Sequence, residues 1–98
     1  MVITIELLCA EIPAREITFR RLPVTIGRGP ETDVPLEDCC VSRQHCKLAE
    51  VDGKPFVCDL DSTNGTFLNG EMIQQAVVEP DDRITVGQTD FRVRFEAP

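Results

Sequence analysis

The sequence has 98 residues, of which 42% are hydrophobic and 28% charged, which predicts a single domain over residues 1–98 with one modest core. Its net charge of −7 opposes the attraction that nucleic-acid binding needs, so no nucleic-acid partner is expected. No apolar run approaches the roughly 18 residues of a membrane span, and Met1 is followed by Glu6 and Glu11 rather than by a basic signal-peptide start, so we expect neither membrane insertion nor export.

Short strands separated by turns are the elements predicted along the chain. Seven prolines and six glycines leave few windows long enough for a helix, and β-branched residues cluster between them. In chain order the predicted strands are 2–8, 16–20, 24–28, 46–51, 56–60, 66–68, 83–86 and 91–95. We therefore predict an all-β chain, and strands this close together without helical crossovers favour an antiparallel sandwich or barrel.

The predicted strands are separated by residues that favour turns. Asp52-Gly53, Asn64-Gly65 and Asn69-Gly70 tolerate positive φ, and Pro80-Asp81 favours another reversal of the chain. One segment, 41–49, has a pattern that also fits one face of a short helix, and the hydrophobic periodicity by itself leaves this ambiguity open.

Five cysteines occur in the chain, so at least one thiol has no partner for a disulfide, and their spacing lacks the regularity of a disulfide framework. A reducing compartment, and hence the cytoplasm, is the simpler expectation. Cys46 and Cys58 are expected to face inward as small hydrophobic residues. Cys39 and Cys40 are adjacent and could form a redox-sensitive spot, although two incidental loop thiols explain the pattern more simply.

The most informative polar residues lie in three predicted loop segments, which are 27–28, 42–45 and 59–66. Together they offer guanidinium groups, hydroxyls and an amide, with no nucleophile and base arranged to break a bond, so no enzyme activity is expected. Fork-shaped cations beside short hydroxyl donors suit a compact, doubly charged tetrahedral anion. A phosphate monoester is such an anion.

In order and spacing these residues resemble a forkhead-associated (FHA) domain, a module that reads phosphothreonine in partner proteins. The resemblance covers about residues 24–86 and consists of Gly27-Arg28, then Ser42-Arg43-Gln44-His45, then Asp59 through Thr66, then Asn69-Gly70. It implies a β-sandwich of about eleven strands, antiparallel-rich, with functional loops at one end. It also implies that 42–45 is a loop leading into a strand at Cys46.

The resemblance assigns five residues to phosphopeptide binding. Arg28 would be the main cation for the phosphate, Ser42 would donate its hydroxyl to a phosphate oxygen, and Arg43 would add a second basic contact. Thr63 would contact the phosphate from the opposite loop, and the Asn64 amide would clamp the peptide backbone. The implied partner is a phosphothreonine-containing protein or peptide, such as a Ser/Thr kinase or its substrate, with no cofactor.

The same resemblance gives a second group of residues a supporting role in the architecture of the site. These are Gly27, His45, Asp59, Gly65, Thr66, Asn69 and Gly70. Acidic residues close to the site in sequence should disfavour acidic flanks in the bound peptide. They are Glu31, Asp33, Glu37, Asp38 and Asp61.

Two alternatives to phosphothreonine binding stay open in the sequence. An FHA-like domain could bind partners independently of phosphate or could dimerise, and a phosphate-independent pull-down would distinguish this case. A metal could be held by Cys39, Cys40, His45 and Cys46, but adjacent cysteines do not converge easily on one ion, so no metal is expected.

Overall fold

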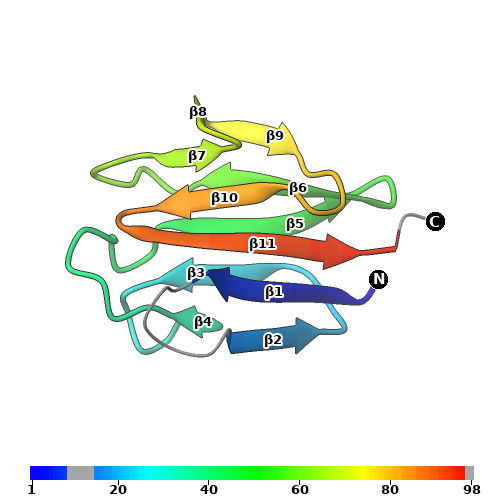
Figure 1. Cartoon of the computed structure of the whole chain (residues 1–98), viewed down its shortest axis with the longest axis horizontal. Coiled ribbons are helices and arrows are strands. Elements are labelled where there is room, and N and C mark those ends of the chain that lie inside the picture. The colour runs from blue at the N-terminus through cyan, green and yellow to red at the C-terminus, as the bar shows by residue number, and fades with distance from the viewer. Residues whose placement is uncertain (9–14, 97–98) are drawn as a thin grey trace.

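The computed structural model describes residues 1–8 and 15–96, and in this part of the chain eleven strands form two facing sheets (Figure 1). The six-stranded sheet has the order β2 (Arg15–Phe19), β1 (Ile3–Leu8), β11 (Thr89–Phe95), β10 (Arg83–Val86), β7 (Thr66–Leu68), β8 (Glu71–Ile73). The five-stranded sheet has the order β4 (Val34–Pro35), β3 (Val24–Gly27), β5 (Cys46–Val51), β6 (Lys54–Asp59), β9 (Gln75–Val77).

The predicted all-β, eleven-stranded sandwich is confirmed. Within the described residues every strand pair with a recorded register is antiparallel except β3 with β4, which is parallel. The ambiguous segment 41–49 contains no helix, and β5 begins at Cys46.

Three strands, β4, β8 and β9, have no counterpart among those predicted from hydrophobic alternation. They contain only two or three residues each, and each lies at the edge of its sheet. A strand of two or three residues is too short to display a period-2 pattern, and an edge strand has a sheet neighbour on only one side.

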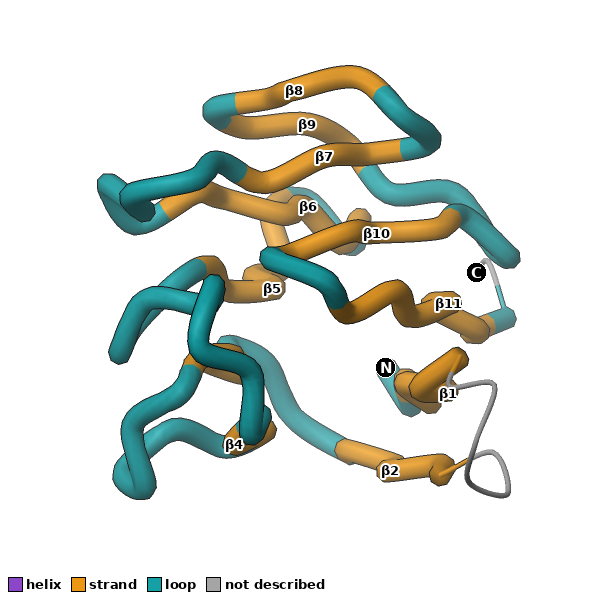
Figure 2. Tube along the Cα trace, turned by 60° about the vertical axis from the view of Figure 1, so that its left-hand side comes forward, coloured by secondary structure: helices purple, strands orange, loops and turns teal. Residues whose placement is uncertain are grey.

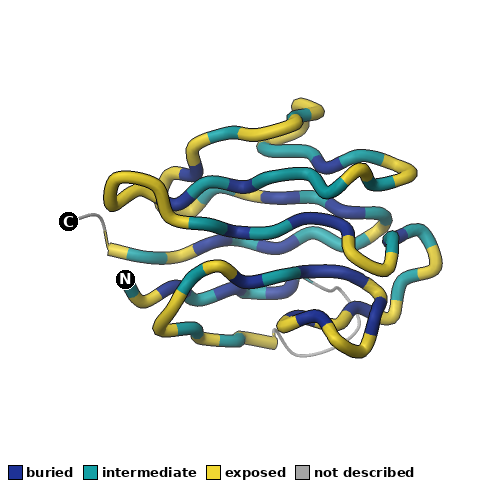
Figure 3. Tube along the Cα trace, turned by 180° about the vertical axis from the view of Figure 1, so that it is seen from behind, coloured by how far each residue is buried: buried dark blue, intermediate teal, exposed yellow. Residues whose placement is uncertain are grey.

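The core lies between the sheets and is built from alternating side chains. In β1 and β11, Ile5 pairs with Val93 and Leu7 pairs with Phe91, and all four side chains are buried. Buried segments occupy the middle of the strands, and exposed residues lie mainly in the connections (Figure 3). This arrangement fixes the register, because a slip of one residue would turn a whole hydrophobic row outward.

Cys46 is fully buried, as the sequence predicts, but the expectation for Cys58 is wrong. Cys58 is half-buried because its neighbour Val57 occupies the core-facing position of β6. Since successive side chains of a strand point to opposite faces, Cys58 lies on the outer side of the sheet.

Two of the predicted turns are two-residue hairpins. Asp52-Gly53 connects β5 to β6 with φ values of 52° and 78°, and Asn69-Gly70 connects β7 to β8 with 50° and 89°. Positive φ at both central residues is typical of the type I′ turn that suits the strand twist. In Asn64-Gly65, by contrast, only Gly65 has a positive φ, and the other left-handed residue of that loop is Asp61.

The connections β3–β4, β4–β5, β6–β7 and β10–β11 gather on the left-hand side of Figure 1, while both ends of the chain lie on the right. Figure 2 shows the first three of these loops from a second direction, again side by side. The strands thus act as a rigid support for one cluster of irregular segments. No helix among the described residues has the length and apolar character needed to cross a membrane.

Candidate functional site

Strand register brings the three informative loops together at one end of the strands of the five-stranded sheet. Ile26 of β3 pairs with Cys46 of β5, and Cys46 pairs on its other side with Asp59 of β6. The loop after β3, the loop before β5 and the loop after β6 therefore leave the sheet at neighbouring points. Residues that are far apart in sequence come together at these loops because each lies within a few positions of Ile26, Cys46 or Asp59.

The first two loops are joined through their backbones at Gly27. The Arg28 amide donates to the Ser42 carbonyl at 2.9 Å, and the Gly29 amide donates to the Arg43 carbonyl at 3.0 Å. A Cβ atom at Gly27 would lie 2.2 Å from the Arg43 carbonyl oxygen, which is closer than any side chain permits. Glycine is thus required at position 27 for the two loops to approach.

His45 is buried and connects the second loop to the third. Its Nδ1 accepts a hydrogen bond from the Ser42 amide at 3.0 Å, its Nε2 donates to the Gly65 carbonyl at 2.8 Å, and its own carbonyl accepts from the Leu60 amide at 2.9 Å. Both ring nitrogens are therefore occupied by backbone partners. This leaves neither nitrogen for proton transfer or for a metal.

Asp59 organises the interior of the third loop. Its carboxylate accepts hydrogen bonds from the Ser62 amide at 3.1 Å, the Ser62 hydroxyl at 2.5 Å and the Thr66 hydroxyl at 2.7 Å. Partial burial by itself would raise the pKa of Asp59, but the hydrogen bonds from Ser62 and Thr66 outweigh it, so the pKa lies below its usual value.

Ser62 has a structural role that the motif pattern did not assign to it. Its hydroxyl donates to Asp59 and accepts from the Gly65 amide at 2.9 Å, so that it closes the loop internally. The signal was present in the sequence, because an Asp followed three positions later by a Ser at a turn is typical of local side-chain to backbone capping.

Arg28 lies at the end of β3 with an exposed side chain. Its Nε donates to the Val41 carbonyl at 3.1 Å, which fixes the direction of the guanidinium group. The ion pairs recorded among the described residues involve Arg92 and Arg94 and do not include Arg28. Its terminal nitrogens are consequently available for an anion from solution.

The second and third loops are connected by hydrogen bonds of Ser42, Thr63 and Asn64. The Ser42 hydroxyl oxygen accepts from the Thr63 amide at 3.0 Å, so its own proton can be donated elsewhere. The Asn64 amide nitrogen donates to the Cys40 carbonyl at 2.8 Å, and no hydrogen bond to its side-chain oxygen is recorded in the described part of the chain. Arg43 lies beside Ser42 with an exposed side chain. The five expected binding residues thus lie on three loops that hydrogen bonds hold together.

Asn69 and Gly70 do not join this group, which corrects the expectation that they support the site. They form the hairpin at the far end of β7 from Thr66. The Asn69 side chain accepts from the Arg83 amide at 2.9 Å and donates to Asp82 at 3.0 Å. Both partners belong to the opposite end of the sandwich, because β10 begins there.

Two of the five neighbouring acidic residues accept hydrogen bonds from other residues of the domain. Asp33 accepts hydrogen bonds from Thr25, and Asp38 accepts them from the Cys40 amide, the Gln88 amide and the Thr89 hydroxyl. Burial would raise the pKa of Asp38, but the bonds from Thr89, Cys40 and Gln88 lower it below the usual value. Asp38 thereby ties the second loop to the β10–β11 connection. Asp38 is half-buried, whereas Asp33 and the other three, Glu31, Glu37 and Asp61, are exposed.

The four-donor metal site considered from the sequence is excluded by the geometry. Cys46 is fully buried in the core whereas Cys39 is exposed, and burial, followed by the negative charge of Asp59, raises the pKa of the Cys46 thiol to about 12. Since His45 also uses both ring nitrogens, neither residue can join Cys39 and Cys40 around one ion.

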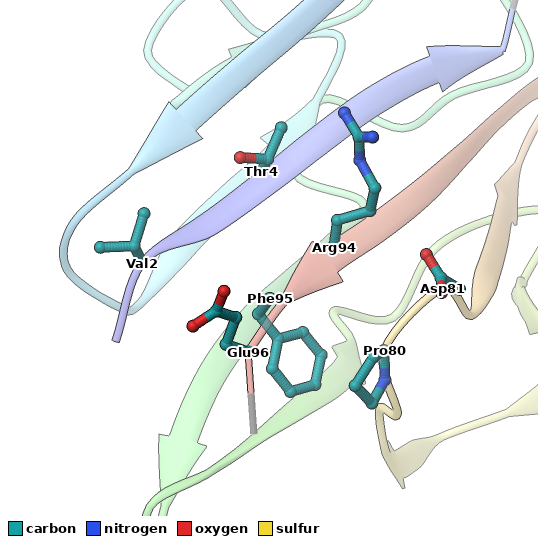
Figure 4. A pocket seen from close by; sticks show the side chains of 7 residues that line it. All are labelled: Val2, Thr4, Pro80, Asp81, Arg94, Phe95 and Glu96. Atoms are coloured by element: carbon teal, nitrogen blue, oxygen red, sulfur yellow. The ribbon is translucent and has the colours of Figure 1, made fainter. Parts of the chain in front are cut away.

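A shallow groove of about 750 Å³ lies away from these loops (Figure 4). It is bordered by the start of β1, the end of β11 and the Pro80-Asp81 turn. Arg94, which lines it, is ion-paired with Glu16 and, at 3.9 Å, with Glu6. The groove is therefore separate from the Arg28 site.

A protein-family model described as FHA domain matches residues 24–87, which is more than half of the chain. The chain belongs to the FHA family. This confirms the resemblance seen in the sequence.

Two curated relatives are regulators. This FHA domain is 39% identical over 75 residues to an oxoglutarate dehydrogenase inhibitor of Corynebacterium diphtheriae, with 76% of this chain and 51% of that protein covered. It is 38% identical over 69 residues to the glycogen accumulation regulator GarA of Mycolicibacterium smegmatis, with 70% of this chain and 42% of that protein covered. The chain thus spans about half the length of these relatives.

Similarity to solved structures extends over the whole domain. A structure from a structural and functional analysis of phosphothreonine-dependent FHA domain interactions is 29% identical, with a TM-score of 0.87 and 98% of each chain covered. This FHA domain is accordingly related to an inhibitor and a regulator, and to an FHA domain studied for its interactions.

Proposed function

We propose that this FHA domain binds phosphothreonine in a partner protein or peptide through the loops that carry Arg28, Ser42, Arg43, Thr63 and Asn64. The observation that carries the proposal is the exposed Arg28 guanidinium, fixed through its Nε and free of any ion pair recorded among the described residues, beside the Ser42–Thr63 hydrogen bond. A cation and a hydroxyl donor on a preorganised frame suit a phosphate dianion.

Each residue has a separate task in this proposal. Arg28 and Arg43 supply charge, and the Ser42 hydroxyl and Thr63 supply short hydrogen bonds to phosphate oxygens. Each charge-assisted bond contributes about 1.5 to 3 kcal/mol net, so three or four of them discriminate strongly against unphosphorylated threonine. After the cost of ordering the peptide, the expected dissociation constant is on the order of micromolar.

Asn64 recognises the peptide backbone rather than the phosphate. Its side-chain nitrogen is held by the Cys40 carbonyl, which fixes the direction of the amide group on an exposed residue. An amide acceptor of fixed direction can receive a backbone N–H of an extended peptide.

The phosphate site and the similarity to an FHA domain with phosphothreonine-dependent interactions support a proposal for the class of partner. We propose that the partner is a Ser/Thr kinase or a substrate of such a kinase, and that the domain recruits it without catalysing a reaction. The free thiols at Cys39, Cys40, Cys46 and Cys58 support function in a reducing compartment such as the cytoplasm.

Titration calorimetry with a phosphothreonine peptide and its unphosphorylated twin tests the proposal. The phosphopeptide should bind and the twin should not, and Arg28→Ala should weaken binding about tenfold or more. Arg83→Ala is the matched control, because Arg83 is exposed at the opposite end of the sandwich. Equal affinity for the two peptides would reject phosphate recognition and favour a phosphate-independent interaction, and equal affinity of wild type and Arg28→Ala would reject the role of Arg28.

A further inference from the structure

Two adjacent cysteines in the β4–β5 loop form a cluster that the phosphothreonine site does not use. Cys39 is exposed, Cys40 is half-buried, and their Sγ atoms lie 4.0 Å apart. A carboxylate oxygen of Asp38 lies close by, so that the three ligand atoms are all within 4.8 Å of one another. Although adjacent cysteines do not converge easily on one ion, two soft donors and one hard donor here lie close enough together to reach the same ion.

The distance between the sulfurs suits a shared cation. Two thiolates bound at about 2.3 Å to one tetrahedral Zn²⁺ lie about 3.8 Å apart, which is close to the observed 4.0 Å. A disulfide would require the sulfurs of Cys39 and Cys40 to approach to about 2.05 Å, with a large distortion of the turn. The observed separation is therefore closer to that of two ligands of one metal than to that of a disulfide.

The third donor is held in place by hydrogen bonds. Asp38 Oδ2 accepts from the Gln88 amide at 2.8 Å and from the Thr89 hydroxyl at 2.7 Å, while the one hydrogen bond recorded for Oδ1 among the described residues comes from the Cys40 amide at 2.9 Å. Oδ1 thus retains a lone pair for a cation. Contacts of this kind orient ligands in known metal sites.

The cluster also lacks a positive charge of its own. The ion pairs recorded for the described residues involve only Glu6 and Glu16 on the acidic side, so none of them neutralises Asp38. A carboxylate with two thiols that become thiolates on coordination is a ligand set of three negative charges. Such a set favours a divalent cation with an affinity for sulfur.

We propose that Asp38, Cys39 and Cys40 form a binding site for a thiophilic divalent cation of the Zn²⁺ type, with a fourth position open to water or another ligand. Binding releases the two thiol protons to solvent as the metal–sulfur bonds form, with no change of oxidation state. The site differs from the excluded four-donor set, because it uses neither His45 nor Cys46. It does not depend on phosphothreonine binding.

The site is tested by titrating the fully reduced chain with Cd²⁺ and measuring the ultraviolet thiolate-to-metal charge-transfer absorption. Competition with Zn²⁺ then gives the affinity for Zn²⁺. Wild type should bind one metal per chain. Cys39→Ser and Cys40→Ser should each weaken binding about tenfold or more, and Asp38→Asn about tenfold. Cys58→Ser is the matched control, since Cys58 is a free, half-buried cysteine of β6, and it should bind like wild type.

Circular dichroism of each variant shows whether it is folded, and the Cys39→Ser variant changes only an exposed thiol. Undiminished binding by both folded cysteine variants would overturn the proposal. So would a stoichiometry of one metal per two chains with a dimer in light scattering, because that result requires ligands from two copies.

Discussion

Two Asn-Gly pairs of this FHA domain have different roles. Asn69-Gly70 is a local hairpin turn, in which both residues have positive φ and the asparagine contacts residues at the start of β10. In Asn64-Gly65 only the glycine has positive φ, and the asparagine side chain reaches across to Cys40 in another loop. The same dipeptide can therefore form a turn or hold two loops together.

The difference lies in what surrounds each pair. Asn69 is followed at once by the returning strand β8, so the local turn determines its conformation. Asn64 lies in a connection that is already fixed by Asp59, Ser62 and His45. Its side chain is thus free to make a contact between loops, which is what a binding site requires.

Gly27→Ala should have the largest effect on the loop end. Its Cβ would collide with the Arg43 carbonyl at 2.2 Å, so we expect a loss of about 3 to 5 kcal/mol in the free energy of unfolding, measured by urea denaturation. Gly53→Ala is the control, because a Cβ atom at Gly53 would have no neighbour within 4 Å and only the positive φ of 78° opposes the change. Equal losses in the two variants would contradict the close approach.

His45→Ala should have the next largest effect. It leaves the Ser42 amide and the Gly65 carbonyl without partners, and we expect a loss of about 2 to 3 kcal/mol in the free energy of unfolding. Phosphopeptide affinity should also fall, because the second and third loops lose their connection. A folded variant of undiminished stability and affinity would show that the histidine is dispensable.

The two asparagines should separate stability from binding. Asn69→Ala should cost about 1 to 2 kcal/mol in the free energy of unfolding, through the left-handed φ and the lost hydrogen bonds, with phosphopeptide affinity unchanged. Asn64→Ala should lower affinity about tenfold with a smaller effect on stability. Urea denaturation and calorimetry of both variants check this, and loss of affinity in Asn69→Ala would contradict the separation.

The acidic residues should give the smallest effect, visible in the pH dependence of stability. The folded pKa values of Asp59 and Asp38 are lowered, so their contribution is present above the unfolded value of about 3.9 and is lost as pH falls below it. Denaturation between pH 6 and about pH 3 should show a shallower decline in Asp59→Asn and in Asp38→Asn than in wild type. Parallel curves for all three proteins would contradict this assignment.

Much of the fold could be predicted from local patterns. The alternation in β1, β5 and β11 and the turn pairs at Asp52-Gly53 and Asn69-Gly70 were sufficient to predict strands and reversals there. The short edge strands could not be predicted, because their pairing depends on a neighbour that only the assembled sheet provides. The outward position of Cys58 could not be predicted either, because the register of β6 is set by Val57 in the core.

For the site, the residue types follow from the sequence and their neighbours follow from the structure. The resemblance pointed to His45 as a support, but its two partners, the Ser42 amide and the Gly65 carbonyl, are visible only in the folded chain. The distant position of Asn69-Gly70 was not predicted, because motif order does not state at which end of a strand a turn will lie. The approach of the Cys39 and Cys40 sulfurs depends on the turn that Asp38 holds.

By itself the sequence determined an all-β chain with an arginine, hydroxyls and an amide in its turns, because alternation and turn preferences act over a few residues. Only the tertiary structure decided that these turns meet. Ile26, Cys46 and Asp59 are paired across three neighbouring strands, so the ends of these strands lie side by side. The physical reason is that strand register is selected by burial of the whole core, and the positions of the loops follow from that register.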